Sequence, residues 1–129
     1  MANFDPAAKV LEFLAEWAPG VEAIDDALDR WFRADTVWEN VGIATTTGPE
    51  EAKQFLRDFR KQLPMAGIEI ITHHIAATGN IVLTERTDNL MSADGECLVP
   101  LAIMGIFELD DDGKVKAWRD YMDTAQFSE

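Results

Sequence analysis

The spacing of apolar residues changes halfway along the chain, and this change constrains the fold more than any other feature. Up to about residue 63, apolar side chains recur every three or four positions, as they do on one face of an α-helix. From residue 68 onward they follow the two-residue alternation of β-strands, interrupted by short turn sequences. Helices followed by a run of long antiparallel strands predict an α+β fold.

Three helices are predicted in the first half of the chain. The first ends before Pro19 and Gly20, and the third begins at Gly48 and Pro49, because proline suits the first turn of a helix. Each helix carries one apolar stripe of the kind that packs against a core. The three stripes are Val10, Leu11, Leu14 and Trp17; Ile24, Ala27, Leu28, Trp31 and Phe32; and Ala52, Phe55, Leu56, Phe59 and Leu63.

Four long strands are predicted in the second half, and one short strand precedes the third helix. Glycine-containing turn sequences separate the long strands. A curved sheet of such strands, with the helices on its concave face, would form a cone with an internal pocket. We expect residues 1–129 to form a single domain of this kind. The predicted strands are 36–41, 68–77, 81–91, 98–109 and 115–123.

The charge balance excludes several classes of partner. Lysine and arginine number 11 against 24 aspartates and glutamates, which gives a net charge of −13 at pH 7. Such a chain repels phosphate backbones and anionic lipid surfaces, so neither nucleic-acid nor membrane binding is expected. Cys97 is the single cysteine, so no disulfide is predicted, and a reducing, cytoplasmic location is favoured.

Charged and polar side chains fall on otherwise apolar strand faces. Residues two apart share a face of a strand, so Arg86 and Asp88 point to the same side. Asp120 lies between apolar neighbours on the last strand, and Trp38 and Asn40 share a face of the short strand. If these faces converge, they form one polar cluster inside a greasy cavity. The apolar residues predicted to line that cavity are Leu90, Trp118 and Met122.

The electrostatics of such a cluster point to acid–base chemistry. Two carboxylates about 4 Å apart repel by roughly 4 kcal/mol at an effective dielectric near 20, and burial acts in the same direction. One carboxyl group should therefore keep a proton near neutral pH, while Arg86 balances the other. The alternative interpretation is a structural ion-pair cluster, or strand residues that simply face water.

Other reactive residues give weaker indications. His73 and His74 are adjacent in a strand and are predicted to point to opposite faces, one exposed and one packed, which argues against a shared metal ion. Cys97 follows a turn without a histidine partner and is interpreted as a buried or bystander thiol. Phosphate loops, dinucleotide motifs and nucleophile elbows are absent from the sequence. We therefore predict neither a cofactor nor a metal ion.

Two strand sequences resemble a known enzyme family. Segment 83–88 reads Leu-Thr-Glu-Arg-Thr-Asp, and segment 113–123 reads Gly-Lys-Val-Lys-Ala-Trp-Arg-Asp-Tyr-Met-Asp. Together they resemble the limonene-1,2-epoxide hydrolase family, and the order of elements is similar over nearly the whole chain. The resemblance implies the cone-shaped α+β fold of nuclear transport factor 2, ketosteroid isomerase and SnoaL-like cyclases, with a curved mixed or antiparallel sheet.

The resemblance also implies roles for five residues. Asp120 would take a proton from water, and Asp88 would protonate the epoxide oxygen. Arg86 would bridge the two carboxylates, and Asn40 would help to hold the water. Trp38 stands where the family has a water-holding tyrosine, and its indole N–H can donate a hydrogen bond but cannot accept one. The implied reaction is cofactor-independent hydrolysis of a lipophilic, cyclic or terpene-like epoxide to a vicinal diol, by a homodimer.

Two other functions are open at this point. A SnoaL-like or ketosteroid-isomerase-like isomerase or cyclase would use one aspartate beside a carbonyl group. A non-catalytic module would bind a small apolar ligand or mediate dimerisation, because this fold hosts many functions. A catalytic site predicts Asp88, Arg86 and Asp120 in mutual hydrogen-bond contact with Asn40 facing them, whereas a binding module predicts these groups apart or solvated.

Overall fold

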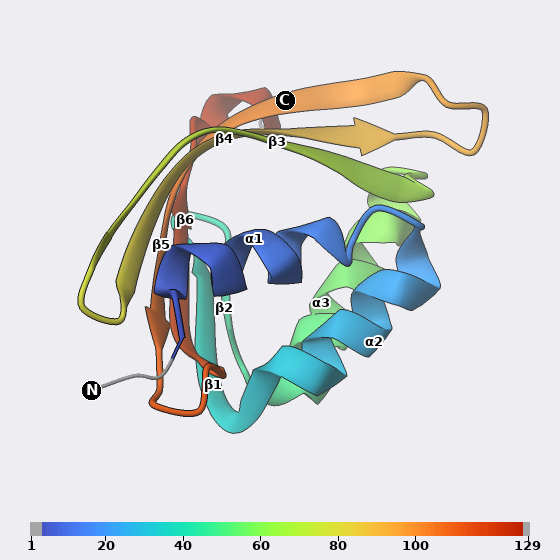
Figure 1. The fold of residues 1–129 in the computed structure, drawn as a ribbon. Helices are drawn as coiled ribbons and strands as arrows, with labels where there is room; N and C mark the ends of the chain where they lie inside the picture. Colours follow the sequence, from blue (N-terminus) through green and yellow to red (C-terminus); the bar gives the residue numbers. More distant parts are fainter. Residues whose placement is uncertain (1–3, 128–129) are drawn as a thin grey trace.

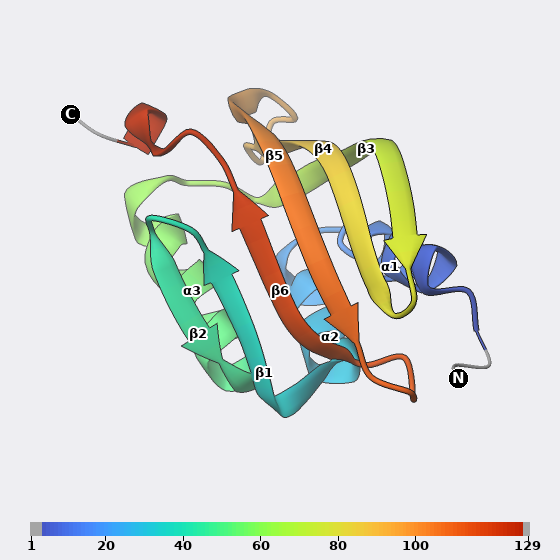
Figure 2. The same ribbon diagram turned by 90° about the vertical axis from the view of Figure 1, so that its left-hand side faces the viewer.

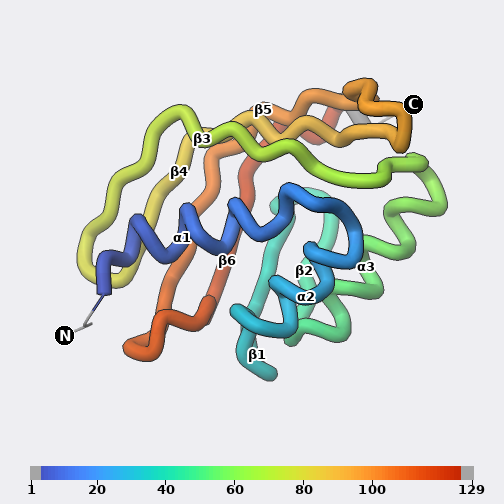
Figure 3. The backbone as a smooth tube through the Cα atoms, turned by 45° about the vertical axis from the view of Figure 1, so that its right-hand side comes forward, coloured from blue at the N-terminus to red at the C-terminus, as the bar shows by residue number. Residues whose placement is uncertain are grey.

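A computed structural model describes residues 4–127 and shows three helices packed against one strongly curved sheet (Figure 1). Helices α1 (Pro6–Ala15), α2 (Val21–Trp31) and α3 (Gly48–Gln62) lie inside the curve of the sheet (Figure 3). A short 3-10 helix, η1 (Thr124–Phe127), follows the last strand. The predicted α+β class and the placement of the helices on the concave face are confirmed.

Six strands form the sheet in the order β2-β1-β6-β5-β4-β3 (Figure 2). Neighbouring strands are antiparallel except β1 and β6, which run parallel, so the sheet is mixed. This parallel pairing places Trp38 beside Trp118 and Asn40 beside Asp120. The strands are β1 (Phe32–Asn40), β2 (Ala44–Thr47), β3 (Gly67–Thr78), β4 (Ile81–Met91), β5 (Cys97–Leu109) and β6 (Val115–Tyr121).

The first strands of the sheet differ from the prediction. The strand predicted at 36–41 begins at Phe32, directly after α2, so Phe32 belongs to a strand and not to the helical stripe. Strand β2 is a further element that the sequence did not predict. Its four residues read Ala-Thr-Thr-Thr and carry no apolar alternation, because β2 lies at the edge of the sheet and pairs with β1 alone.

A cap residue and proline explain where α1 and α3 begin. The Asp5 carboxylate accepts hydrogen bonds from the backbone N–H groups of Ala7 and Ala8, which satisfies donors that the start of α1 leaves open. Proline occupies the first turn of both α1 and α3, where its missing N–H costs nothing. Within residues 4–127, no helix combines the length and the apolar character that crossing a membrane requires.

The helices and the concave face of the sheet share one aromatic core. Phe13 of α1 is fully buried and meets the rings of Trp17, Phe107 and Trp118 edge-on. Leu11 was predicted in the same stripe but is 41% exposed, because it lies on the flank of the face that Phe13 occupies. Burying one large apolar side chain contributes roughly 1.5–3 kcal/mol, so this core anchors α1 across the middle of the sheet.

Candidate active site

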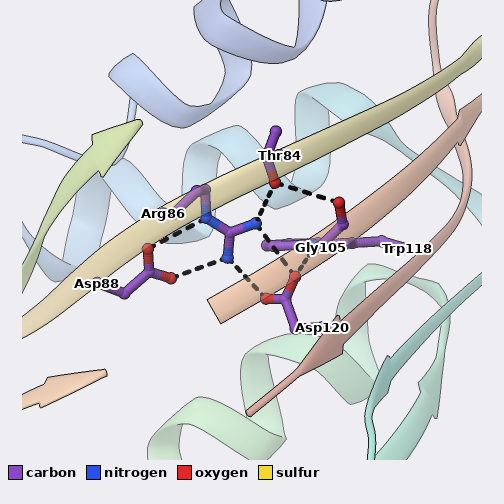
Figure 4. Close-up of polar contacts among 6 residues, drawn as sticks. All are labelled: Thr84, Arg86, Asp88, Gly105, Trp118 and Asp120. Carbon is purple, nitrogen blue, oxygen red and sulfur yellow. Dashed lines mark hydrogen bonds and ion pairs between the residues drawn. The ribbon is translucent and has the colours of Figure 1, made fainter. Parts of the chain in front are cut away.

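The sheet brings the predicted polar residues together on its concave face. Along β4 the inward positions carry Thr84, Arg86 and Asp88, and all three are buried. The inward positions of β6 carry Trp118 and Asp120, which are also buried. Figure 4 shows the two aspartates on either side of the arginine, in a cluster built from neighbouring strands.

Arg86 lies between the two carboxylates and uses all five of its N–H groups (Figure 4). Its Nε and Nη2 donate to the two oxygens of Asp88, at 3.1 and 3.0 Å. Its Nη1 and Nη2 donate to the two oxygens of Asp120, at 3.1 and 2.9 Å. The last N–H, on Nη1, donates to the Thr84 hydroxyl at 3.0 Å. Two bidentate pairs on one guanidinium fix both carboxylates relative to each other.

Burial controls the protonation of this cluster. Burial raises the pKa of the Asp120 carboxyl, and the Arg86 charge offsets this effect only in part. For Arg86, burial opposes the charged form, but the charges of Asp120 and Asp88 outweigh it, so the pKa of the guanidinium is raised and it stays protonated. The cluster therefore holds a permanent positive charge, and the Asp120 carboxyl keeps a proton at a higher pH than an exposed aspartate does.

Stacked aromatic rings support Asp120 from the side. The Trp118 Nε1 donates to Asp120 Oδ1 at 2.7 Å. The Trp118 ring is stacked between Trp38 and Phe107, with centroid distances of 4.7 and 4.8 Å, which fixes the direction of its N–H. The Trp38 Nε1 is buried and has no hydrogen-bond partner among the described residues. The indole N–H groups of Trp17 and Trp31 are buried in the same way, without a partner among the described residues.

A pocket lies over the cluster, between the sheet and the helices. Its polar lining consists of Asn40, Asp88 and Asp120, and the predicted lining residues Leu90, Trp118 and Met122 all face it, as does Trp38. The volume of the pocket is about 60 Å³, which is enough room for a few water molecules. The remaining lining residues are Trp17, Ile43, Phe55, Leu56, Phe59, Met65, Ile68, Leu101 and Ile103. Of these, Trp17, Phe55, Leu56 and Phe59 belong to the helical stripes that were predicted to pack against the core.

Two members of the cluster, Thr84 and Gly105, were not predicted as site residues. The Thr84 hydroxyl accepts from Arg86 and donates to the backbone carbonyl of Gly105 at 3.2 Å. The available signal for Thr84 was its place on the same strand face as Arg86 and Asp88. For Gly105 it was a glycine inside an apolar strand, which often marks the close approach of another group.

The two adjacent histidines lie on the same, outer face of the sheet, which corrects the prediction that they point to opposite faces. The register of β3 against β4 shifts between Thr72 and His74, and the extra residue of this bulge breaks the alternation. Both imidazoles are exposed. His73 contacts the Thr87 hydroxyl at 2.8 Å, and His74 contacts the Glu85 carboxylate at 2.7 Å.

The cysteine is exposed and not buried. Its Sγ lies 3.6 Å from the Asn89 side-chain oxygen, which is a weak contact at the start of β5. Among residues 4–127, His, Cys, Asp and Glu side chains form no group of three that could hold a metal ion.

The curved mixed sheet with helices on its concave face defines the fold class. The chain is similar to a putative SnoaL-like polyketide cyclase from Shewanella denitrificans OS-217, with a TM-score of 0.76 over 95% of this chain and 93% of that one. At 14% identity this similarity shows the fold alone. The chain belongs to the limonene-1,2-epoxide hydrolase family, because residues 8–128 match the model of the limonene-1,2-epoxide hydrolase catalytic domain.

Matches to epoxide hydrolases from Mycobacterium tuberculosis agree with this assignment. The chain is 39% identical over 98 residues to epoxide hydrolase EphG from strain ATCC 25618 / H37Rv, which covers 76% of this chain. The match spans 62% of the length of EphG, less than two thirds of it. The structure of an M. tuberculosis LEH-like epoxide hydrolase is 33% identical, with a TM-score of 0.72 over 93% of this chain and 84% of that chain.

Proposed function

We propose that this protein is a cofactor-independent epoxide hydrolase that converts a lipophilic epoxide to a vicinal diol. The observation that carries the proposal is Arg86 hydrogen-bonded to both Asp88 and Asp120 beside an apolar pocket. Family membership and the name of EphG support an epoxide substrate. Because an epoxide already contains ring strain, a positioned water with one acid and one base is sufficient to open it.

Asp120 serves as the base in this mechanism. Asn40 lies directly beside Asp120 in the register of β1 and β6, so a water bound by the Asn40 amide can point a proton at the Asp120 carboxylate. The raised pKa of Asp120 brings its basicity closer to neutral pH, where a general base is most effective. Trp38 supports the base through its stacking on Trp118, whose N–H donates to Asp120.

Asp88 serves as the acid on the other side of Arg86. As the water oxygen bonds to one epoxide carbon, the C–O bond of the ring breaks and its oxygen takes the proton of Asp88. Asp120 gains a proton in the same step, so the net charge of the cluster does not change. Proton exchange through water in the pocket then restores the starting state.

The shape of the pocket supports a substrate larger than its inner part. A wider groove, with a volume of about 420 Å³, lies next to the pocket along α3. The two spaces share Ile43, Phe55 and Phe59 in their linings, so a ligand can extend from one into the other. A cyclic or terpene-like epoxide would place its reacting ring over the aspartates and its apolar remainder in the groove.

A screen for diol formation tests the proposed function. We expect the purified protein to hydrolyse at least one cyclic, terpene or aryl epoxide from a panel that includes limonene oxide and cyclohexene oxide. The Asp88→Asn variant, purified in the same way, controls for contaminating hydrolases. Turnover no greater than that of the variant on every epoxide would reject the function, and a carbonyl product in place of a diol would indicate an isomerase.

The origin of the new oxygen tests direct attack by water. We expect the diol from a single turnover in ¹⁸O-labelled water, with enzyme in excess, to carry the label. The reason is that Arg86 holds both carboxylates in bidentate pairs, which leaves them poor nucleophiles. Unlabelled first-turnover diol, with the label later found in Asp88 or Asp120, would instead show a covalent ester.

We also propose that the protein is a cytoplasmic homodimer, which fits a single exposed cysteine in a reducing compartment. The outer face of the sheet exposes apolar side chains, among them Ile71, Leu83, Met104 and Tyr121, at 41–51% of their surface. Such a patch favours association between copies of the chain. Analytical ultracentrifugation should give twice the chain mass, and Met104→Glu should shift the equilibrium toward monomer. A wild-type monomer at high concentration would contradict the proposal.

A further inference from the structure

Four neighbouring strands place four residues in one row across the concave face of the sheet. Thr84 pairs with Gly105, Gly105 with Asp120, and Asp120 with Asn40. Gly105 is the member of the row without a side chain. The Arg86 guanidinium reaches from β4 to Asp120 on β6, across the position that Gly105 leaves open (Figure 4).

A side chain at position 105 would collide with the cluster. A Cβ built on Gly105 would lie closer than 3.0 Å to both Arg86 Nη1 and Asp120 Oδ1, and 3.1 Å from the Thr84 hydroxyl. These atoms cannot easily move, because every N–H of Arg86 is already bonded. The backbone of Gly105 does not have a positive φ, so the space, and not the backbone conformation, requires glycine here.

Among the five hydrogen bonds that Arg86 donates, the one to Thr84 does not go to a carboxylate. The Thr84 hydroxyl proton is committed to the Gly105 carbonyl at 3.2 Å, so a lone pair faces Arg86 Nη1 at 3.0 Å. Nη1 contacts Thr84 and Asp120, whereas Asp88 is held by Nε and Nη2. A loss at Thr84 therefore disturbs the Asp120 side of the guanidinium first.

We propose that Thr84 and Gly105 are positioning residues for the acid–base pair. Gly105 leaves the space in which the guanidinium meets Asp120, and Thr84 fixes the plane of the guanidinium so that both carboxylates are held at once. This inference rests on the proposed function, because the positions of the carboxylates affect hydrolysis only if the cluster is catalytic.

Loosening Arg86 has a defined effect on the pH dependence. The charged groups that face Asp120 are Arg86 and Asp88 of β4, while β1 and β5 contribute the uncharged Asn40 and Gly105. Arg86 lowers the pKa of Asp120 against the effects of burial and of Asp88. A looser Arg86 therefore leaves this pKa higher, and the acidic limb of the kcat/KM profile moves to higher pH.

Substitutions at Thr84 and Gly105 separate positioning from general structural damage. Thr84→Val removes the hydroxyl and keeps the shape of the side chain. For this variant we expect kcat to fall about tenfold with little change in KM. We also expect the acidic limb of its kcat/KM profile to move up by about one pH unit. Thr84→Ser keeps the hydroxyl and should resemble wild type. Gly105→Ala should show a larger loss of kcat. Its matched control is Gly67→Ala on β3, where a Cβ meets just the Gly20 Cα, at an ordinary 3.7 Å.

An NMR titration of the Asp120 side-chain carboxyl carbon tests the same point without substrate. An upward shift of its pKa in Thr84→Val, with none in Thr84→Ser, would support the inference. An unchanged titration in folded Thr84→Val, or a Gly105→Ala enzyme as active as Gly67→Ala, would overturn it. If Gly105→Ala does not fold, Thr84→Val decides the question. If wild type hydrolyses no epoxide, the proposed function fails, while the titration still tests the positioning of Arg86.

Discussion

Replacing Asp120 with asparagine is expected to lower kcat/KM for diol formation by about 10²–10⁴-fold, the usual contribution of a general acid or base. Asparagine has nearly the same shape, and an amide oxygen in the Oδ1 position can still accept from Trp118 Nε1 and Arg86 Nη1. Its amide cannot take a proton from water. The chain should therefore fold while the proposed base is lost.

The comparison uses the best substrate from the epoxide panel, with circular dichroism as the check on folding. Asp112→Asn, in the exposed turn between β5 and β6, is the matched control and should retain wild-type activity. Asp88→Asn is expected to lose activity to a similar extent, because it removes the proposed acid. A folded Asp120→Asn enzyme that keeps more than about a tenth of the wild-type rate would contradict the assignment of the base.

The charged members of the cluster were predictable because strand alternation is rigid. Arg86 and Asp88 lie two apart and must share a face, and the same rule aligns Asp120 with its apolar neighbours. The rule does not say which strands are neighbours. That Asn40 lies beside Asp120 depends on the parallel pairing of β1 with β6, which apolar periodicity alone does not reveal.

The failures of the sequence pattern have local causes. His73 and His74 share a face because of a bulge, and a single extra residue leaves no apolar signature. Helix α3 lines the pocket with Phe55 and Phe59, which carry the same pattern whether they face a core or a cavity. Gly105 is the residue that is hardest to predict from the sequence. It contributes the space that a side chain would otherwise fill, and an empty space leaves no sequence pattern.

Replacing Arg86 with leucine is expected to abolish activity and to lower the melting temperature by on the order of 10 °C. Removing one partner of a buried ion pair costs about 3–5 kcal/mol, and each kcal/mol shifts the melting temperature of a domain of this size by several degrees. Leucine leaves Asp88 and Asp120 buried without a counter-charge. Arg86→Lys keeps the charge but cannot form two bidentate pairs, so it should lose activity with a smaller loss of stability.

The pH dependence of the stability loss in Arg86→Leu tests its cause. Without Arg86, the hydrogen bond from Trp118 is left to oppose the burial and the repulsion from Asp88 that raise the pKa of Asp120. A carboxyl group whose pKa is higher in the folded state contributes stability below its unfolded pKa and loses it as pH rises through its folded pKa. The stability deficit of Arg86→Leu relative to wild type should therefore be small near about pH 4 and grow toward about pH 8.

Arg119→Leu, which breaks a partly exposed pair with Glu108, is the control and should cost about 1 kcal/mol or less at either pH. Equal stability of Arg86→Leu and wild type at the higher pH would show that the guanidinium does not compensate the buried carboxylates.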